Sequence, residues 1–327
     1  MTMKTKLVIC LGALLGIAAT VQQVGWPLAK LTIHVVGEQG EPIPDADVTI
    51  SFREKLTDRN AWTAGKTDKA GNFTAEGHSD KRLSGSVRKT GYYEAGTGWI
   101  IFKDPILGKW QPWDTVAEAV LRPIGNPVAL AARRVQGDIP GLEQPCGYDL
   151  EKGDWVVPHG KGMRPDLIFN VRRDYKDWSN FTVEAEVTFA QIHDGLVRMK
   201  APAYARNSAF GWERSASETG YVAPHTIRFF SRHLKTHVDQ EKSFEATKDR
   251  EQGYFFRVRT VEENGRIVAA NYGKITGDIG IDPRDSKTCL ITFTYYFNPN
   301  SLDRNLEWDP KRNLLQGLNR EQTPTGP

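Results

Sequence analysis

The fold of the first third of this chain is decided by Leu31-Thr32-Ile33-His34-Val35 and, after a turn, Val48-Thr49-Ile50-Ser51-Phe52. In both stretches apolar and polar residues alternate, which is typical of a strand with one buried and one exposed face. Between them, residues 37–46 contain two glycines and two prolines, which favour a turn. We therefore predict two strands of one small β-sandwich.

The residues that follow continue this module. Asp68–Gly71 forms a tight turn that brings Phe73 to the core, residues 83–88 supply a further strand, and Gly91-Tyr92-Tyr93 follows it. This order of strands and turns resembles the carboxypeptidase regulatory-like, or transthyretin-like, domain. The resemblance implies a β-sandwich over residues 28–125 that acts as a scaffold or spacer, and none of the matched positions carries a reaction.

The first twenty residues indicate export. Lys4 and Lys6 precede an apolar run over residues 7–19 that ends in small residues. This pattern predicts a secretory signal peptide at residues 1–20 and a secreted or periplasmic, cell-envelope protein with no stable membrane span after cleavage. The alternative is an uncleaved anchor, although the run is shorter than the ~20 residues that a spanning helix needs. Cys10 lies inside the run, which disfavours a lipoprotein.

Composition narrows the class of protein. The chain has 43 basic and 40 acidic residues, a net charge of +3, and this balance does not favour a nucleic acid as partner. Thirty glycines and eighteen prolines separate short alternating segments. This pattern predicts an all-β protein.

A second, larger domain is expected over residues 146–315. Residues 181–189 alternate cleanly, residues 253–261 and 266–275 flank an Asn-Gly turn, and residues 289–297 form an aromatic-rich strand that we expect to be central. We predict an antiparallel β-sandwich of jelly-roll or concanavalin-like character.

Three segments fall outside these strands. Residues 126–145 are rich in turn residues and are predicted to be a linker between the domains. Residues 316–327 have too few apolar side chains to pack and are predicted to be a disordered tail. Residues 229–246 have mixed polarity and fit either a helix or a long loop.

Cys146 and Cys289 remain once the leader is removed. In an oxidising compartment a disulfide between them is a natural hypothesis. Cys289 alternates with Ile291 and Phe293, so its side chain is expected on the apolar face of its strand, where a buried free thiol fits equally well.

Glu184 and Glu186 are the strongest indication of catalysis. They lie two apart on one strand face, as paired carboxylates do in some glycoside hydrolases built on concanavalin-like sandwiches. That arrangement carries a third acid at the position of Thr188, so the set is incomplete. A solvated strand face explains both glutamates without catalysis.

Two clusters offer metal ligands. His233 and His237 are four apart, which places both imidazoles on one face of a helix, but the surrounding basic residues oppose a cation. Asp303 and Asn305 lie in an oxygen-rich stretch that suits calcium, although the same residues are common in turns. We predict no metal at either place and no cofactor.

Trp99, Trp110 and Trp113 lie in a segment rich in glycine and proline, where a loop need not bury them. Their flat faces suit stacking on sugar rings, with Gln111 and Asp114 to bind hydroxyls. Sealing the contact between the domains is the alternative.

Three functions remain open. We favour a secreted or envelope-associated, non-enzymatic protein that binds a glycan or a protein partner. The alternative is a polysaccharide-acting glycoside hydrolase that uses Glu184 and Glu186. A purely structural surface protein is the third.

Overall fold

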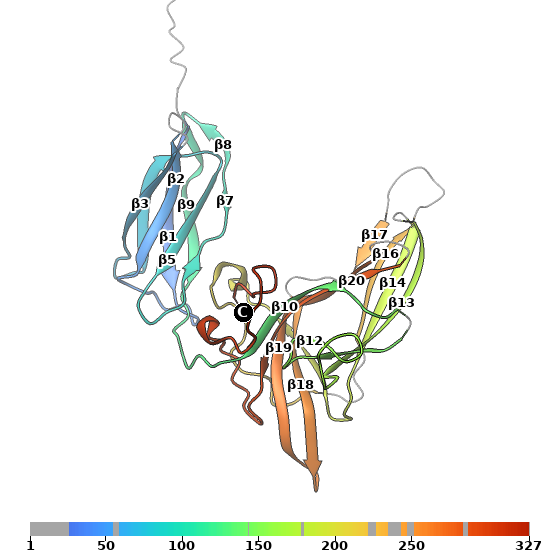
Figure 1. The fold of residues 1–327 in the computed structure, drawn as a ribbon. Coiled ribbons are helices and arrows are strands. Elements are labelled where there is room, and N and C mark those ends of the chain that lie inside the picture. The colour runs from blue at the N-terminus through green and yellow to red at the C-terminus, as the bar shows by residue number, and fades with distance from the viewer. Residues whose placement is uncertain are drawn as a thin grey trace, which may run out of the picture.

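The computed structural model describes residues 26–54, 59–142, 144–177, 180–221, 227–234, 243–246, 252–283 and 287–326. Within these ranges the chain is all-β, as predicted, and its helical elements are the short 3-10 helices η1 (Ala205–Asn207) and η2 (Pro310–Arg312). The predicted signal peptide, residues 1–20, lies outside the described residues. Among the described residues, no helix is both long and apolar enough to span a bilayer. Figure 1 shows the strands gathered into two domains.

The first domain is built from two sheets, with strand orders β4-β1-β9-β8 and β3-β2-β5-β6; β7 also pairs with β5. β1 runs parallel to β9 and antiparallel to β4. The strands are β1 (Leu28–Val36), β2 (Asp47–Glu54), β3 (Arg59–Lys66), β4 (Asn72–His78), β5 (Arg82–Arg88), β6 (Ala95–Gly96), β7 (Ile100–Ile101), β8 (Lys103–Ile106) and β9 (Lys109–Val120).

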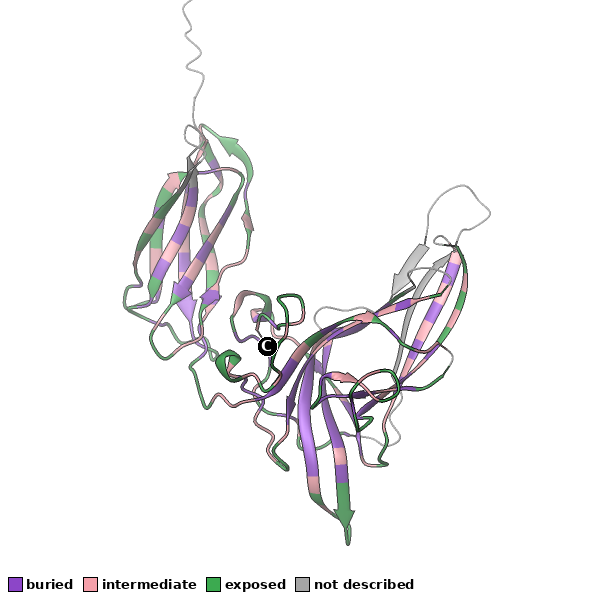
Figure 2. Ribbon diagram, in the orientation of Figure 1, coloured by how far each residue is buried: buried purple, intermediate pink, exposed green. Residues whose placement is uncertain are grey.

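Alternation sets the core of this domain, as the sequence predicts. Leu31 and Ile33 of β1 are fully buried, and Val48 and Ile50 of β2 join them in one apolar cluster. The two sheets approach closely at Gly85 of β5. A Cβ there would lie 2.1 Å from Cδ1 of Ile33, so the position has no room for a larger side chain unless Ile33 moves. Figure 2 shows buried and exposed residues alternating along these strands.

The second domain also packs two sheets, with strand orders β10-β20-β19-β18-β15 and β12-β11-β13-β14-β16-β17. One large apolar cluster takes residues from both sheets. The strands are β10 (Ala131–Asp138), β11 (Cys146–Asp149), β12 (Asp154–Trp155), β13 (Leu167–Asp177), β14 (Asn180–Thr188), β15 (Gly195–Lys200), β16 (Ile227–Leu234), β17 (Ser243–Ala246), β18 (Gln252–Glu263), β19 (Arg266–Pro283) and β20 (Cys289–Asn298).

The predicted strands of this domain form where alternation is strongest. Buried and half-buried residues alternate without interruption along β14. The β18–β19 hairpin turns at Asn264 and Gly265, whose φ angles of 52° and 77° suit the primed turns that Asn-Gly favours. β20 has a neighbour on each side, β10 and β19, so its predicted interior position is confirmed.

The predictions for three segments differ from the structure. The expected linker, 126–145, contains β10, whose eight residues pair with β20, so the second domain begins before Cys146. The expected disordered tail packs from residue 316 to 326, because backbone hydrogen bonds and turn-capping side chains replace apolar burial; Pro324 is buried. Within residues 229–246, residues 229–234 belong to β16 and residues 243–246 form β17, where a helix or a long loop is expected from the sequence; residues 235–242 lie outside the described ranges.

The junction between the domains is formed by the loop of residues 201–221, which follows β15. Phe210 of this loop stacks on Tyr93 of the first domain, with ring centroids 4.9 Å apart. Arg122, 3% exposed, donates from Nη1 to the carbonyls of Phe210 (2.9 Å) and Trp212 (2.8 Å), and from Nε to Glu38 (2.7 Å). Apolar stacking and charge-assisted hydrogen bonds therefore hold the domains together.

Two further buried ionisable side chains, Glu307 and Lys274, complete the junction. Glu307, 3% exposed, accepts hydrogen bonds from the backbone N–H groups of Gly125 and Asn126 and from the Tyr93 hydroxyl. Lys274 is fully buried, and its Nζ donates to the carbonyl of Glu213 and lies 4.4 Å from the centre of the Phe210 ring. Burial lowers the pKa of Lys274 well below its ordinary value, and the nearby charge of Arg122 lowers it further.

Candidate binding surfaces

The outer face of the β3-β2-β5 sheet carries two exposed tryptophans. Trp62 of β3 pairs with Ser51 of β2, and Ser51 pairs in turn with Ser84 of β5. Trp99 immediately precedes β7, which pairs with β5, so this residue continues the same row beyond Ser84. The side chains of Trp62 and Trp99 are 67% and 70% exposed. Two indoles thus flank a pair of serines in one row across the sheet.

Polar groups surround Trp99. The Arg82 guanidinium carbon lies 5.7 Å from the centre of the indole ring. Ser51, Ser84 and Asp80 line a pocket of about 190 Å³ beside it. This surface therefore offers an apolar ring face next to hydroxyl, carboxylate and guanidinium groups, the combination that recognises the faces and hydroxyls of sugars.

The other two predicted tryptophans lie elsewhere. Trp110 is 7% exposed, packs near Phe102 and donates its indole N–H to the carbonyl of Ser79 at 2.8 Å, so it belongs to the core. Trp113 is half-buried, with Lys109 Nζ 4.4 Å from its ring centre. The junction is formed by Tyr93, Arg122 and their partners, not by these tryptophans.

Sequence reasoning missed Trp62. Residues 61–66 carry no long apolar alternation, so they were not recognised as a strand. The available signal was an indole among small and polar residues, which is what an outward-facing position on an antiparallel strand looks like.

Glu184 and Glu186 lie on the solvent side of β14. The register sets Glu184 opposite Arg172 and Glu186 opposite Asn170 of β13. Glu184 lines a shallow depression of about 580 Å³ with Arg172 and its neighbours, and Glu186 is not among the lining residues. The two carboxylates therefore do not line one common depression, as a catalytic pair acting on one glycosidic bond would.

The predicted metal-ligand clusters form no site among the described residues. His233 lies on β16, a strand and not the helix that the spacing requires, and His237 falls outside the described ranges. Asp303 and Asn305 serve a turn: Asn298 donates to Asp303 Oδ2 at 3.0 Å, and Asn305 donates to the carbonyl of Asn126 at 2.9 Å.

Cys146 and Cys289 are both buried free thiols, the second of the two alternatives that the sequence leaves open. Both lie in the main core of the second domain, where the apolar face of β20 was predicted to place Cys289. The Cys146 thiol is directed at the carbonyls of Gly141 and Gln144, whereas that of Cys289 is directed at the carbonyl of Leu290.

The densest charge cluster of the second domain surrounds Arg259. This residue has a φ of +60° inside an irregularity of β18, and its guanidinium binds both oxygens of Asp166 at 2.8 and 2.9 Å. Asp194 accepts the backbone N–H groups of Arg259 and Thr260. Burial raises the pKa of both carboxyls. These contacts tie the loop before β13 to β18, beside a depression of about 700 Å³.

No protein-family model matches the chain, and no curated protein matches it. Three solved structures resemble parts of it. A 3-chlorocatechol 1,2-dioxygenase from Rhodococcus opacus has 12% identity and a TM-score of 0.25 over 32% of this chain, which spans only 62% of the dioxygenase. A candidate carbohydrate-binding protein from Bacteroides uniformis has 9% identity and a TM-score of 0.21, covering 81% of this chain and 95% of that one. The shaft pilin SpaA from Lactobacillus rhamnosus has 11% identity and a TM-score of 0.19, covering 75% and 92%. Scores this low establish neither a shared fold nor a shared function.

Proposed function

We propose that this protein is a secreted or envelope-associated, non-enzymatic binding protein whose first domain contacts glycans through Trp62 and Trp99. The exposure of these two indoles on one sheet face, 67% and 70%, is the observation that carries the proposal. The proposal includes export by residues 1–20 and a carboxypeptidase regulatory-like scaffold over residues 28–125.

The fold does not require either indole. The core of the first domain closes without them, and large apolar side chains left in water on one face mark an interaction surface. Trp62 and Trp99 are separated by three interstrand steps along this row, roughly 14 Å, so a ligand that contacts both must be extended. A glycan chain meets this condition, because successive rings present flat faces along its length.

The residues between the indoles favour a glycan over a protein partner. Ser51 and Ser84 are small and bear hydroxyls, and they make the row between the indoles polar. The centre of a protein interface is usually a continuous apolar patch, whereas sugar recognition combines ring stacking with hydrogen bonds to hydroxyls. Arg82 and Asp80 lie beside Trp99 to supply such bonds.

A binding experiment with paired variants tests the proposal. We expect the purified protein without residues 1–20 to bind at least one member of a polysaccharide panel that includes cell-wall fractions. Trp62→Ala combined with Trp99→Ala should weaken that binding at least tenfold, about 1.4 kcal/mol. Val116→Ala is the matched control, since Val116 is also exposed, 65%, but lies on β9 of the other sheet.

Two results would contradict the proposal. One is a blank panel at high protein concentration, which would favour a purely structural protein. The other is unchanged binding by the double variant while circular dichroism shows that it is folded. Steady cleavage of a bound polysaccharide would show instead that the protein is an enzyme.

A further inference from the structure

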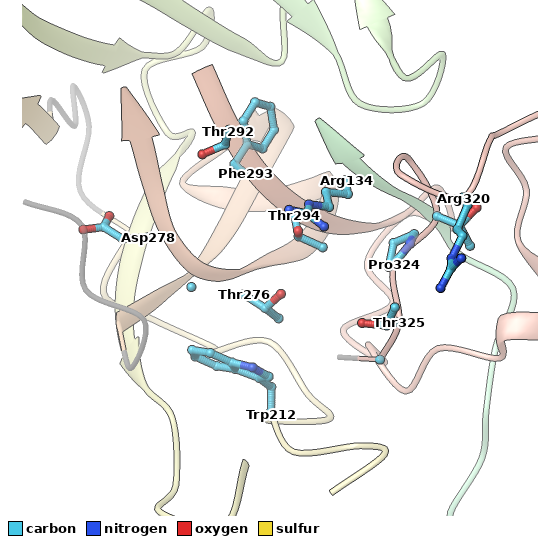
Figure 3. Close-up of a pocket in the computed structure, with 13 residues that line it drawn as sticks. Arg134, Trp212, Thr276, Asp278, Thr292, Phe293, Thr294, Arg320, Pro324 and Thr325 are labelled. Atoms are coloured by element: carbon cyan, nitrogen blue, oxygen red, sulfur yellow. The ribbon is translucent and has the colours of Figure 1, made fainter. Parts of the chain in front are cut away.

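A further pocket lies on the outer face of the five-stranded β10-β20-β19-β18-β15 sheet in the second domain. Thr294 of β20 pairs with Arg134 of β10 on one side and with Thr276 of β19 on the other, which places the three side chains in one row across the sheet. Thr292 lies on the same face two residues earlier. Figure 3 shows this row between Trp212 and residues 320–325. The pocket has a volume of about 370 Å³.

The C-terminal segment, residues 316–326, forms one wall of this pocket. The backbone N–H of Arg134 donates to the carbonyl of Gln322 at 2.7 Å, so the segment follows the edge of the sheet at β10. Asn319 caps its turn by accepting from the N–H groups of Glu321 and Gln322, both at 2.9 Å. Pro324 is buried and lines the pocket. The wall is therefore held by the fold itself.

The pocket is electropositive. Arg134 and Arg320 both line it, and neither makes an ion pair with a residue that the structure describes. The carboxylate in the lining, Asp278, is engaged by the Tyr254 hydroxyl and the N–H of Ile279, each at 2.9 Å. Two guanidinium groups thus lie beside a row of threonine hydroxyls, opposite an indole.

Each group restricts the occupant. Guanidinium forks bind carboxylate or sulfate oxygens in pairs. Threonine hydroxyls donate to and accept from ligand hydroxyls. Trp212 is 9% exposed and packs in an apolar cluster with Met199 and Phe255, so it forms a fixed apolar wall of the pocket. We propose that this pocket binds an acidic saccharide, with Arg134 and Arg320 holding its carboxylate or sulfate group. The site lies in the other domain and is independent of the contact proposed for Trp62 and Trp99.

Calorimetric titration with defined oligosaccharides tests this proposal. The four probes are an oligogalacturonate, a sulfated oligosaccharide, the neutral galactose counterpart and inorganic sulfate. We expect binding of one acidic oligosaccharide, weaker binding of the neutral counterpart by at least about tenfold, and a loss of affinity as salt is raised. The two acidic probes distinguish a carboxylate from a sulfate as the recognised group. Inorganic sulfate that binds as well as either would overturn the saccharide assignment.

Matched arginine variants locate the site. Arg134→Gln and Arg320→Gln should each weaken binding of the acidic oligosaccharide at least about fivefold, and the double variant should abolish it. Arg198→Gln is the control, because Arg198 is an exposed arginine on β15 of the same sheet but outside the pocket. Trp62→Ala with Trp99→Ala should leave this binding intact. Unchanged affinity in the folded double arginine variant, or no binding of either acidic probe at millimolar concentration, would overturn the proposal.

Discussion

The domain junction and the outer face of the β3-β2-β5 sheet use side chains in opposite ways. At the junction, Arg122, Lys274 and Glu307 are almost completely buried, and every one of them is engaged by a backbone group or a side chain of the other elements. On the sheet face, Trp62 and Trp99 are two-thirds exposed. The buried charged side chains thus hold the junction together, whereas the candidate ligand contacts of the first domain are exposed apolar rings.

This difference shows how a site should be recognised in this molecule. Charged groups with shifted pKa values, such as Lys274 and Asp166, owe the shift first to burial in the fold, and each is held by hydrogen bonds to structural partners. The structure gives no comparable reason for large apolar side chains that stay exposed outside the core, such as Trp62 and Trp99. The comparison predicts that variants at the junction change stability and variants on the sheet face change binding.

The largest contrast is expected between two tryptophans of the first domain. Trp110→Ala should lower the free energy of unfolding by about 3–5 kcal/mol, because it removes a buried ring and leaves a cavity. Trp99→Ala should change it by less than about 0.5 kcal/mol, because its ring is in water. Urea denaturation followed by circular dichroism measures both. Equal losses of stability would mean that Trp99 stabilises the fold and that its exposure does not mark a binding surface.

Glu307→Ala should follow closely, with a loss of about 3 kcal/mol. The substitution leaves the N–H groups of Gly125 and Asn126 and the hydroxyl of Tyr93 without their acceptor. Glu218→Ala is the control, since this carboxylate pairs with Arg304 at the surface and is 75% exposed. A Glu307→Ala protein as stable as the control would mean that the hydrogen bonds of Glu307 do not stabilise the fold, contrary to the comparison.

Lys274→Met tests the same junction through pH. The folded-state pKa of Lys274 is lowered, so between that pKa and the ordinary value the unfolded chain binds more protons, and stability must rise with pH. We expect the wild type to gain about 1.4 kcal/mol per pH unit relative to Lys274→Met within that interval. Denaturation midpoints of both proteins at several pH values measure the slope. Parallel curves would mean that Lys274 stays charged in the folded protein.

Alternation predicted what is local. The faces of β1 and β14 were readable because a period of two fixes which side chains are buried, and the Asn264-Gly265 turn was readable from its dipeptide. The strand at residues 131–138 was not, because its partner β20 lies about 160 residues further along the chain, and Gly137, Pro140 and Gly141 favour a linker.

The candidate surfaces were readable only in part. Trp99 and Trp110 come from one segment of similar composition, but Trp110 lies on β9, which pairs with the distant β1, and Trp99 precedes β7, which pairs with β5. The partners of Arg259 and Arg134 come from remote strands as well. Pairing between distant segments, which leaves no local signal, therefore decided which polar residues became structural and which were left to meet a ligand.

The smallest effect is expected at Cys146 and Cys289, where the second domain offers an internal check. Burial raises the pKa of the Cys289 thiol to about 11, which leaves almost no thiolate at neutral pH to start oxidation. Protein purified in air should therefore keep both thiols, and a reductant should not move its denaturation midpoint. Thiol reagents should label the two residues only when denaturant is added. A mass lower by two hydrogens, with a midpoint that falls on reduction, would show instead that oxidation has closed a disulfide inside this core and that the core must rearrange to hold it.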